Sequence, residues 1–387
     1  MSTLVRAAAD EARLIFTDAG VLIITVAAIV IYSFVYPVPY LNQVLRDVPI
    51  AVEDHDDSAL SRRLVAMADA HPSVRVAARV SSPAEAEALL TRGGVTGILV
   101  VPHGFEQDVL RGRTAHVSVE ADASYLLAYS AVTTGVLESA GTLSAGIEVA
   151  RFQARGRTRE AAMRERRPVG LELRPLFNVS SGYGSYVVPA VFVLILQQTL
   201  LIGIGMTGGA RRERMRAGSG PAFDADGHPI LQVAGRAMPY LALYAANAAY
   251  YFGFMPRYYG YAAPGSTSAV VMLTVPFLLA TTMLGFTLRI AFQRRETAMQ
   301  ILLFTSLPLV FLGGFAWPVE ALPGWLHAAA LAVPTTSAIP AFLRLITMGA
   351  GLSDVAAEAA TLWALVAIYF PLACLVERML PTAPSAH

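Results

Sequence analysis

The sequence predicts a membrane α-helical bundle of six transmembrane helices, with an α/β domain inserted after the first helix. Hydrophobic residues make up 55% of the 387 residues and charged residues only 15%, whereas a soluble domain carries roughly 25% charged residues. The mean hydropathy is +0.53. Six segments are apolar over the roughly 20 residues that a helix needs to cross a bilayer. A long polar interval separates the first segment from the second, and this interval predicts the inserted domain.

The six apolar segments divide the chain into an anchor, a polar interval and a C-terminal block of five helices. They lie at residues 19–38, 186–206, 237–255, 269–290, 298–315 and 359–376. We expect residues 1–39 to hold the N-terminal segment and the first helix. Residues 40–184 are expected to form the inserted domain, and residues 185–387 the five-helix domain.

The first apolar segment is interpreted as an uncleaved anchor rather than as a signal peptide. The acids Asp10, Glu11 and Asp18 precede it. Its end, YPVPYLN, lacks the small-residue cleavage pattern of a secretory signal. We therefore expect this segment to remain in the membrane.

Arginines are concentrated in alternate short loops between the apolar segments. Short cytoplasmic loops of membrane proteins carry an excess of basic residues. This distribution predicts that both termini are cytoplasmic and that residues 40–184 are extracytoplasmic. The arginines concerned are Arg6, Arg13, Arg211, Arg212, Arg214, Arg216, Arg236, Arg294 and Arg295.

The inserted domain is predicted to contain a β-α-β pattern followed by a long helix. An apolar run from residue 48 ends in acids, a helical stretch follows, and valines then alternate from Val74 to Val80. The acidic cluster at residues 53–57 has the ligand types of a divalent-metal site, but its position favours a helix N-terminus capped by Asp57 or Ser58. No metal or cofactor is therefore expected.

Residues 318–350 are predicted to form short helices that enter the outer leaflet without crossing it. The stretch from 325 to 348 is apolar, but Pro334 and Pro340 would break a single helix there. Arg344 would also lie in the hydrocarbon, at a high energetic cost. Two short helices accommodate these residues better than a seventh span does.

Several classes of function are disfavoured by residues that the sequence lacks. None of the 29 basic residues is lysine, so the phosphate-binding loop GxxxxGK[ST] is absent and ATP must be hydrolysed by another polypeptide if it is used. A net charge of +1, without a basic run, disfavours nucleic acid as a partner. No acid lies in the middle of a predicted span, which disfavours a proton-coupled carrier. Nor does any spacing support a catalytic triad.

Polar residues, Thr199 among them, interrupt two of the predicted spans. Gln197 and Gln198 lie in the second apolar segment, and Asn247 lies in the third. Polar groups in hydrocarbon usually face another helix. We expect these side chains to serve helix packing, with a contact to a transported substrate as the alternative.

The C-terminal block resembles the end of ABC-2 type permeases. In that family a helix with a central proline leads to a Gly-Gly-Phe element, a Pro-x-Glu-x-x-Pro-x-Trp stretch and a further proline. The matching residues here are Pro308, Gly313, Gly314, Phe315, Pro318, Glu320, Pro323, Trp325 and Pro334. In addition, VEDHDDSALSRRL, GILVVPHGFEQDVLRG and VEADASY resemble the extracytoplasmic domain of one bacterial efflux subgroup. Together the two blocks cover most of the chain.

The resemblance implies the membrane-spanning permease subunit of an ATP-driven exporter in a bacterial inner membrane. Its partners are then nucleotide-binding ATPase subunits and a second permease, identical or paralogous, with a periplasmic adaptor in some relatives. The expected pathway is lateral, between two copies. The alternative is a non-transport envelope protein whose external domain binds a partner or a wall component.

The resemblance also implies that the segment after the second span contacts the ATPase. Relatives carry an ER-x-x-GT block there, and this chain keeps Arg212 and Glu213 but lacks the Gly-Thr pair. An arginine cluster that fixes topology and touches lipid phosphates is the alternative interpretation. The predicted coupling residues are Arg211, Arg212, Glu213, Arg214 and Arg216.

Overall fold

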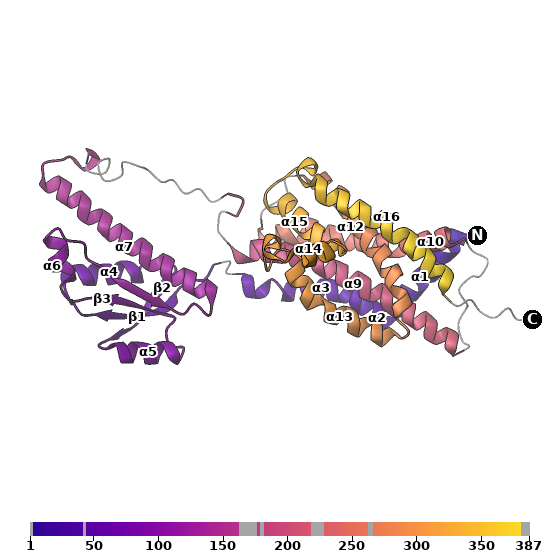
Figure 1. Ribbon diagram of the computed structural model, residues 1–387, viewed down its shortest axis with the longest axis horizontal. Coiled ribbons are helices and arrows are strands. Elements are labelled where there is room, and N and C mark those ends of the chain that lie inside the picture. The colour runs from indigo at the N-terminus through magenta and orange to yellow at the C-terminus, as the bar shows by residue number, and fades with distance from the viewer. Residues whose placement is uncertain are drawn as a thin grey trace, which may run out of the picture. The chain divides into compact units, whose positions relative to one another are not determined.

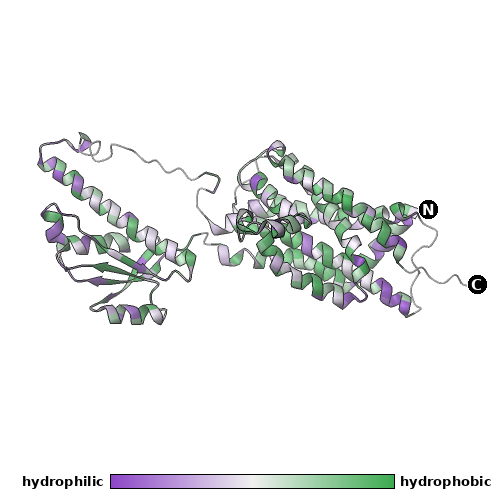
Figure 2. Cartoon of the chain, in the orientation of Figure 1, coloured by the Kyte–Doolittle hydropathy of each residue, from purple (hydrophilic) through white to green (hydrophobic). Residues whose placement is uncertain are grey.

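The computed structural model describes most of the chain as two compact units. The described residues are 3–41, 44–161, 176–178, 182–217, 228–261 and 266–380. The α/β unit is Val44–Arg174, which falls inside the predicted interval 40–184. The membrane unit is Met1–Gln43 together with Pro175–His387. Figure 2 shows apolar residues over most of the helices of the membrane unit and a mixed surface on the α/β unit.

The α/β unit is a four-stranded sheet with helices on both faces. Its order is β2-β1-β3-β4, with β1 parallel to β2 and β3, and β4 antiparallel to β3. The helices α4 and α7 cover one face and α5 covers the other, as Figure 1 shows. The elements are β1 (Val48–Asp54), α4 (Ala59–Asp69), β2 (Val74–Val80), α5 (Pro83–Thr91), β3 (Gly97–Val101), α6 (Phe105–Leu110), β4 (Ser118–Ala121) and α7 (Leu126–Ala154).

Carboxylates of the acidic cluster bind backbone amides at turns and helix ends. Asp54 accepts hydrogen bonds from the amides of Asp56 and Asp57, at 3.1 and 3.0 Å. Asp56 accepts from the amides of Gly104 and Glu106 beside α6, at 2.9 and 3.0 Å. These contacts give the cluster a structural role, in line with the helix-capping interpretation. In this unit the cap of α4 itself is Ser58.

The membrane unit is a bundle of long helices and short connecting turns. Its first span is α2 (Ala19–Leu22), the π-helix η1 (Ile23–Ala27) and α3 (Ala28–Val35), ending with η2 (Val38–Tyr40). The other elements are α1 (Thr3–Thr17), α9 (Tyr183–Arg216), α10 (Pro229–Ala249), η3 (Tyr250–Phe254), α11 (Met255–Tyr259), α12 (Thr267–Leu288), η4 (Arg289–Ala291), α13 (Arg295–Leu312), η5 (Val319–Ala321), α14 (Gly324–Ala330), α15 (Pro334–Thr347), η6 (Leu352–Val355) and α16 (Ala356–Met379).

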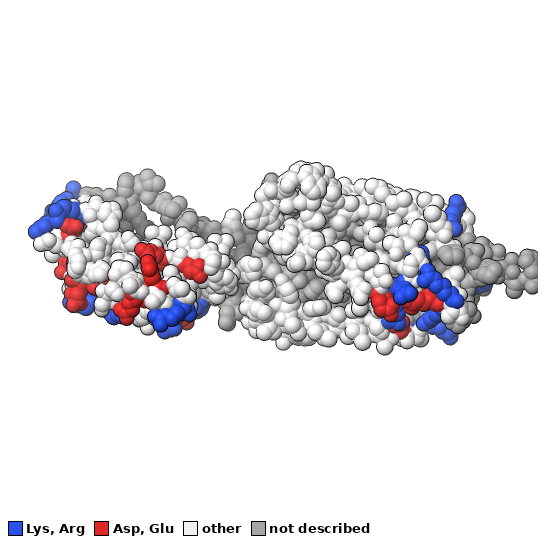
Figure 3. Space-filling model, turned by 60° about the horizontal axis from the view of Figure 1, so that its bottom comes forward, with Lys and Arg blue, Asp and Glu red and all other residues white. Residues whose placement is uncertain are grey.

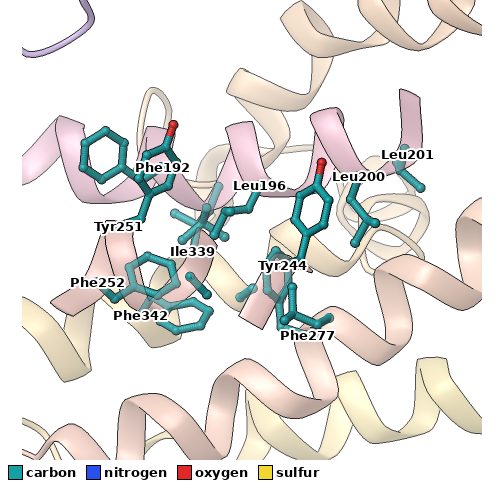
Figure 4. Close-up of a cluster of buried hydrophobic side chains, with 14 of the residues drawn as sticks. Phe192, Leu196, Leu200, Leu201, Tyr244, Tyr251, Phe252, Phe277, Ile339 and Phe342 are labelled. Carbon is teal, nitrogen blue, oxygen red and sulfur yellow. The ribbon is translucent and has the colours of Figure 1, made fainter. Parts of the chain in front are cut away.

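Helix α9 forms the centre of the bundle. In its most apolar stretch 94% of the residues are buried, compared with 17% in α13. Its glycines let neighbouring helices approach closely: a Cβ at Gly203 would lie 2.6 Å from the Thr25 side chain, and one at Gly209 would lie 2.5 Å from the Arg294 backbone. The Phe192 ring stacks on Tyr251 at 4.2 Å within the buried cluster of Figure 4. Close packing around one helix therefore organises the unit.

Among the residues that the structure describes, five helices are long and apolar enough to cross a membrane. They are Ala19–Tyr40, Tyr183–Arg216, Thr267–Ala291, Arg295–Leu312 and Leu352–Met379, and they coincide with five of the six predicted spans. A sixth candidate is the pair α14 and α15, which is bent by 87°. This is the segment predicted as two short helices, and the bend is sharp enough for either a broken span or a re-entrant loop.

The predicted span at 237–255 lies in a helical run from α10 to α11 that is not among those five helices. Hydrogen bonds nevertheless place this run alongside the first span. Asn247 donates to the carbonyl of Thr25 at 3.0 Å, and the Tyr251 hydroxyl donates to the carbonyl of Ile29 at 2.8 Å. Further along, the Tyr259 hydroxyl donates to the carbonyl of Ser33 at 2.9 Å. The two segments therefore run side by side in the same direction.

Candidate functional site

A buried cluster of charges joins five helices at one end of the membrane unit, which we call the charged end. Figure 3 shows charged side chains of this unit gathered at one end of the visible face. At the centre of the cluster is Glu11 of α1, which is fully buried. It forms ion pairs with Arg211 of α9, at 2.7 Å, and with Arg289 after α12. Tyr240 of α10 donates to the same carboxylate at 3.1 Å.

The protonation of Glu11 is set by two opposing effects. Burial raises the pKa of its carboxyl group, because a low dielectric disfavours the charged form. The positive charges of Arg289, Arg211 and Arg236 outweigh burial and hold the pKa at about 2. Glu11 is therefore ionised at neutral pH, and α1 stays attached to the bundle by a charge–charge interaction.

A second buried ion pair links the same end to the last helix. Arg236 of α10 contacts Glu377 of α16, and both side chains are about 95% buried. A buried pair is costly to form but strongly destabilising to break, because the remaining charge is left uncompensated. The pair therefore fixes α10 against α16.

Asp18 fixes the start of the first span. Its carboxylate caps α2 by accepting from the amides of Gly20 and Val21, at 2.9 and 3.2 Å. It also forms a two-point contact with the guanidinium of Arg295, with both distances at 3.1 Å. Burial raises the pKa of Asp18, but these hydrogen bonds and the Arg295 charge lower it overall. The beginnings of the first span and of α13 are thereby held together.

The five predicted coupling residues form the last turns of α9 rather than a loop. Arg211 is bound to Glu11, and Arg212, which is 7% exposed, donates to the carbonyl of Ile290 at 3.2 Å. Glu213 accepts from the amide of Arg295 at 3.3 Å. Arg214 and Arg216 are exposed. Arg211, Arg212 and Glu213 are therefore partly or fully buried. The exposed Arg216 donates to the side-chain carbonyl of Gln293 at 2.5 Å. The segment that follows, residues 218–227, lies outside the described residues.

The polar residues predicted inside the spans bind other helices. Gln197 contacts the first turn of α15: its carbonyl accepts from the amide of Thr335 at 2.9 Å, and its amide donates to the hydroxyl of Thr335 at 3.1 Å. Gln198 donates to the carbonyl of Leu302 and to Ser306 on α13, at 2.9 and 2.8 Å. Asn247 contacts the first span, as described above. Each of these side chains therefore joins two helices of the membrane unit.

The predicted outer-leaflet motif forms the turn between α13 and α14. Gly313 ends α13, and Gly314 has a φ of 78°, which favours glycine. Phe315 is buried, and its carbonyl accepts from the Tyr186 hydroxyl at 2.8 Å.

The rest of the motif lies at the ends of two short helices. Pro318 precedes η5, Pro323 precedes α14, and the Trp325 side chain is 74% exposed. The side chain of Glu320 lies outside the described residues. The motif therefore defines a turn with one exposed aromatic ring.

Sequence reasoning did not identify Glu11, Arg236, Arg289 and Glu377 as a site. A signal for Glu11 was present, because the buried face of α1 consists of Ala7, Glu11 and Ile15 at helical spacing. A carboxylate in an apolar stripe predicts a buried cationic partner. The identity of that partner depends on tertiary packing.

A bundle of long apolar helices, with polar side chains used between helices and ion pairs at one end, defines a multi-pass membrane protein. The family model described as ABC-2 family transporter protein matches residues 19–375. The chain therefore belongs to the ABC-2 transporter family. It is 25% identical over 336 residues to the inner membrane transport permease YhhJ of Escherichia coli K12, covering 85% of each chain. The permease of the same name from Shigella flexneri gives the same identity and coverage.

Proposed function

We propose that this chain is the membrane-spanning permease subunit of an ATP-driven exporter in a bacterial inner membrane. The family match over residues 19–375 carries this proposal. The chain has no lysine and hence no phosphate-binding loop, so a separate nucleotide-binding subunit supplies ATP hydrolysis. In this arrangement the charged end faces the cytoplasm, and the α/β unit is extracytoplasmic.

A second permease copy is part of the proposal because the family resemblance implies one. Three helices expose apolar faces that are available for it: the first span, α13 and α16, the last with 22% of its apolar stretch buried. Only 28% of the apolar stretch of the first span and 17% of that of α13 is buried within the chain. On α13 the residues Leu303, Phe304 and Leu307 are 60 to 82% exposed. These faces fit a contact between copies and a lateral path for an apolar or amphiphilic substrate.

Coupling to the ATPase is assigned to the exposed end of α9. Arg214 and Arg216 project from a helix that packs through the whole bundle, so a force applied there reaches every span that contacts α9. Arginine suits this task because its planar fork binds carboxylates through paired hydrogen bonds. Arg211 and Arg212 act differently, by holding α9 to Glu11 and to the carbonyl of Ile290.

The test is charge reversal at the exposed pair, with Arg214→Glu and Arg216→Glu combined. The permease is reconstituted in liposomes together with the nucleotide-binding subunit that the proposal assigns to it. We expect loss of the rise in ATP hydrolysis that the permease produces, with normal insertion. Arg378→Glu, at an exposed arginine of the same end, is the control and is expected to leave coupling intact. Unchanged stimulation in the double variant would contradict the assignment. Export that persists without the ATPase would contradict the whole proposal.

A further inference from the structure

A cavity of about 390 Å³ lies between the run from α10 to α11 and α12, away from the charged end. Its volume is within the range of roughly 300 to 1,000 Å³ that is usual for small-molecule sites. One wall consists of the small residues Ala245, Ala249 and Gly253, and the opposite wall includes Val271 and Val275. Apolar atoms therefore line almost the whole cavity.

The cavity opens to the outer surface of the helix bundle. Ala245, Ala249, Val271 and Val275 at its rim are exposed, whereas Phe252 at its floor is buried. The α10 to α11 run lies beside the first span, as the bonds from Asn247 and Tyr251 show, so the cavity lies at the depth of the hydrocarbon. An occupant entering from the bilayer is consequently apolar along most of its length.

One end of the cavity is positively polarised. Arg257 lies there, exposed, with one guanidinium N–H donating to the carbonyl of Gly253. Among the residues that the structure describes, no carboxylate pairs with Arg257. Thr267, in the first turn of α12, lines the same cavity, and this turn contains no acid. The amides of a helix N-terminus favour an anion, and so does an arginine without a carboxylate partner among the described residues.

We propose that this cavity binds an anionic phospholipid of the surrounding membrane, with one acyl chain in the slot and the phosphate on Arg257 and the first turn of α12. The positive charge at one end of this apolar cavity favours an occupant that has both an apolar chain and an anionic group. A second copy of the chain is the competing occupant, and the experiment below separates it from a lipid. The site is separate from the lateral path proposed along α13 and the first span, so it holds a resident lipid rather than the cargo. Arginine binds phosphate through charge-assisted hydrogen bonds, which are often bidentate.

The experiment is native mass spectrometry of the purified full chain in mild detergent, with phosphatidylglycerol or phosphatidylcholine added. Arg257→Gln removes the charge, and Arg378→Gln is its matched control at an exposed arginine outside the cavity. Ala249→Phe fills the slot, and Ala246→Phe is its matched control, because Ala246 is an exposed neighbour that does not line the cavity.

We expect the unaltered chain to retain phosphatidylglycerol in preference to phosphatidylcholine. Arg257→Gln is expected to reduce phosphatidylglycerol retention roughly tenfold or more, the loss typical of a hydrogen bond to a charged group. Ala249→Phe is expected to reduce the retention of both lipids, and both controls are expected to behave like the unaltered chain. Arg257 is exposed, so its variant tests the proposal even if Ala249→Phe fails to fold.

Three results would overturn the proposal. Equal retention of the two lipids would contradict the proposal that Arg257 selects an anionic head group. A loss of dimer in Ala249→Phe, with lipid binding unchanged, would assign the cavity to a second copy. Displacement of the bound lipid by an exported compound would assign the cavity to the cargo.

Discussion

Glu11 carries a carboxylate that is buried in an apolar stripe. The stability of this buried charge depends on two arginines that come from distant parts of the chain. Glu11→Gln keeps the shape of the side chain but leaves Arg211 and Arg289 without their counter-charge. Removing one partner of a buried ion pair typically costs about 3 to 5 kcal/mol of stability. We therefore expect a marked fall in the thermal unfolding temperature of the detergent-solubilised protein. Asp10→Asn, one residue earlier and exposed, is the control. Equal effects of the two substitutions would contradict the role of Glu11.

The ion pairs of Glu11 contribute to folding stability in a pH-dependent way, because the pKa of Glu11 is lowered in the folded chain. Burial raises that pKa, and the charges of Arg289, Arg211 and Arg236 lower it from the ordinary 4.5 to about 2. Above pH 4.5 the carboxylate is ionised in both the folded and the unfolded chain, so its contribution to stability is complete. The contribution falls as the pH drops from 4.5 to 2. We expect the stability difference between the unaltered chain and Glu11→Gln to be constant from about pH 5 to pH 7 and to narrow in acid. Denaturant unfolding of both proteins at a series of pH values measures this stability difference.

At the scale of the element, α9 depends on glycines where other backbones cross it. Gly209→Ala would place a Cβ 2.5 Å from the backbone of Arg294 and Arg295, and backbone atoms cannot move aside as a flexible side chain can. Overpacking of this kind costs about 1 to 3 kcal/mol, so we expect α13 to loosen from α9 and the unfolding temperature to fall.

Gly141→Ala is the matched control for this substitution. Gly141 lies inside α7, with nothing within 4 Å of an added Cβ. Alanine is about 1 kcal/mol better than glycine in a helix interior. We therefore expect no loss of stability from this change. Tolerance of Gly209→Ala would show that α13 does not pack against α9 as closely as described.

Hydropathy alone does not identify the run from α10 to α11 as a membrane span. Its apolar character is diluted by polar and charged residues such as Arg236 and Asn247, so it is not among the five described helices that are long and apolar enough to span a membrane. Both residues are used: Arg236 pairs with Glu377, and Asn247 binds the carbonyl of Thr25 inside the π-helical turn η1. A helix surrounded by other helices can carry such groups, because its neighbours supply the partners that lipid does not.

At the scale of the whole molecule, the proposed topology makes a direct prediction. Single cysteines are introduced at Ser118 in β4 and at Ala217 after α9, both exposed, in a Cys374→Ala background. In intact cells an impermeant thiol reagent is expected to label residue 118 but not residue 217. Permeabilisation is expected to expose residue 217. Labelling of both from outside would contradict the proposed orientation and with it the cytoplasmic position of the charged end.

Much of the architecture follows from the sequence alone. Five of the predicted spans, the bend at residues 325–348 and the β-α-β order can be read from local patterns of apolar, proline and capping residues. The family also follows from the Gly313 to Trp325 motif, because the order and spacing of those residues are visible in the sequence. These features depend on residues close together in the chain, so periodicity and composition are sufficient to predict them.

Only the tertiary structure decides which groups are buried together at the charged end and which stay exposed. Glu11 is 200 residues from Arg211 and 278 from Arg289, and no local pattern relates them. The same packing buries Arg212 and leaves Arg214 and Arg216 on the surface, although all three look alike in the sequence. The physical reason is that a charge at the end of a span can point to water, to lipid phosphates or to a neighbouring helix. The choice among these depends on how closely the helices pack, and here the glycines of α9 set that distance.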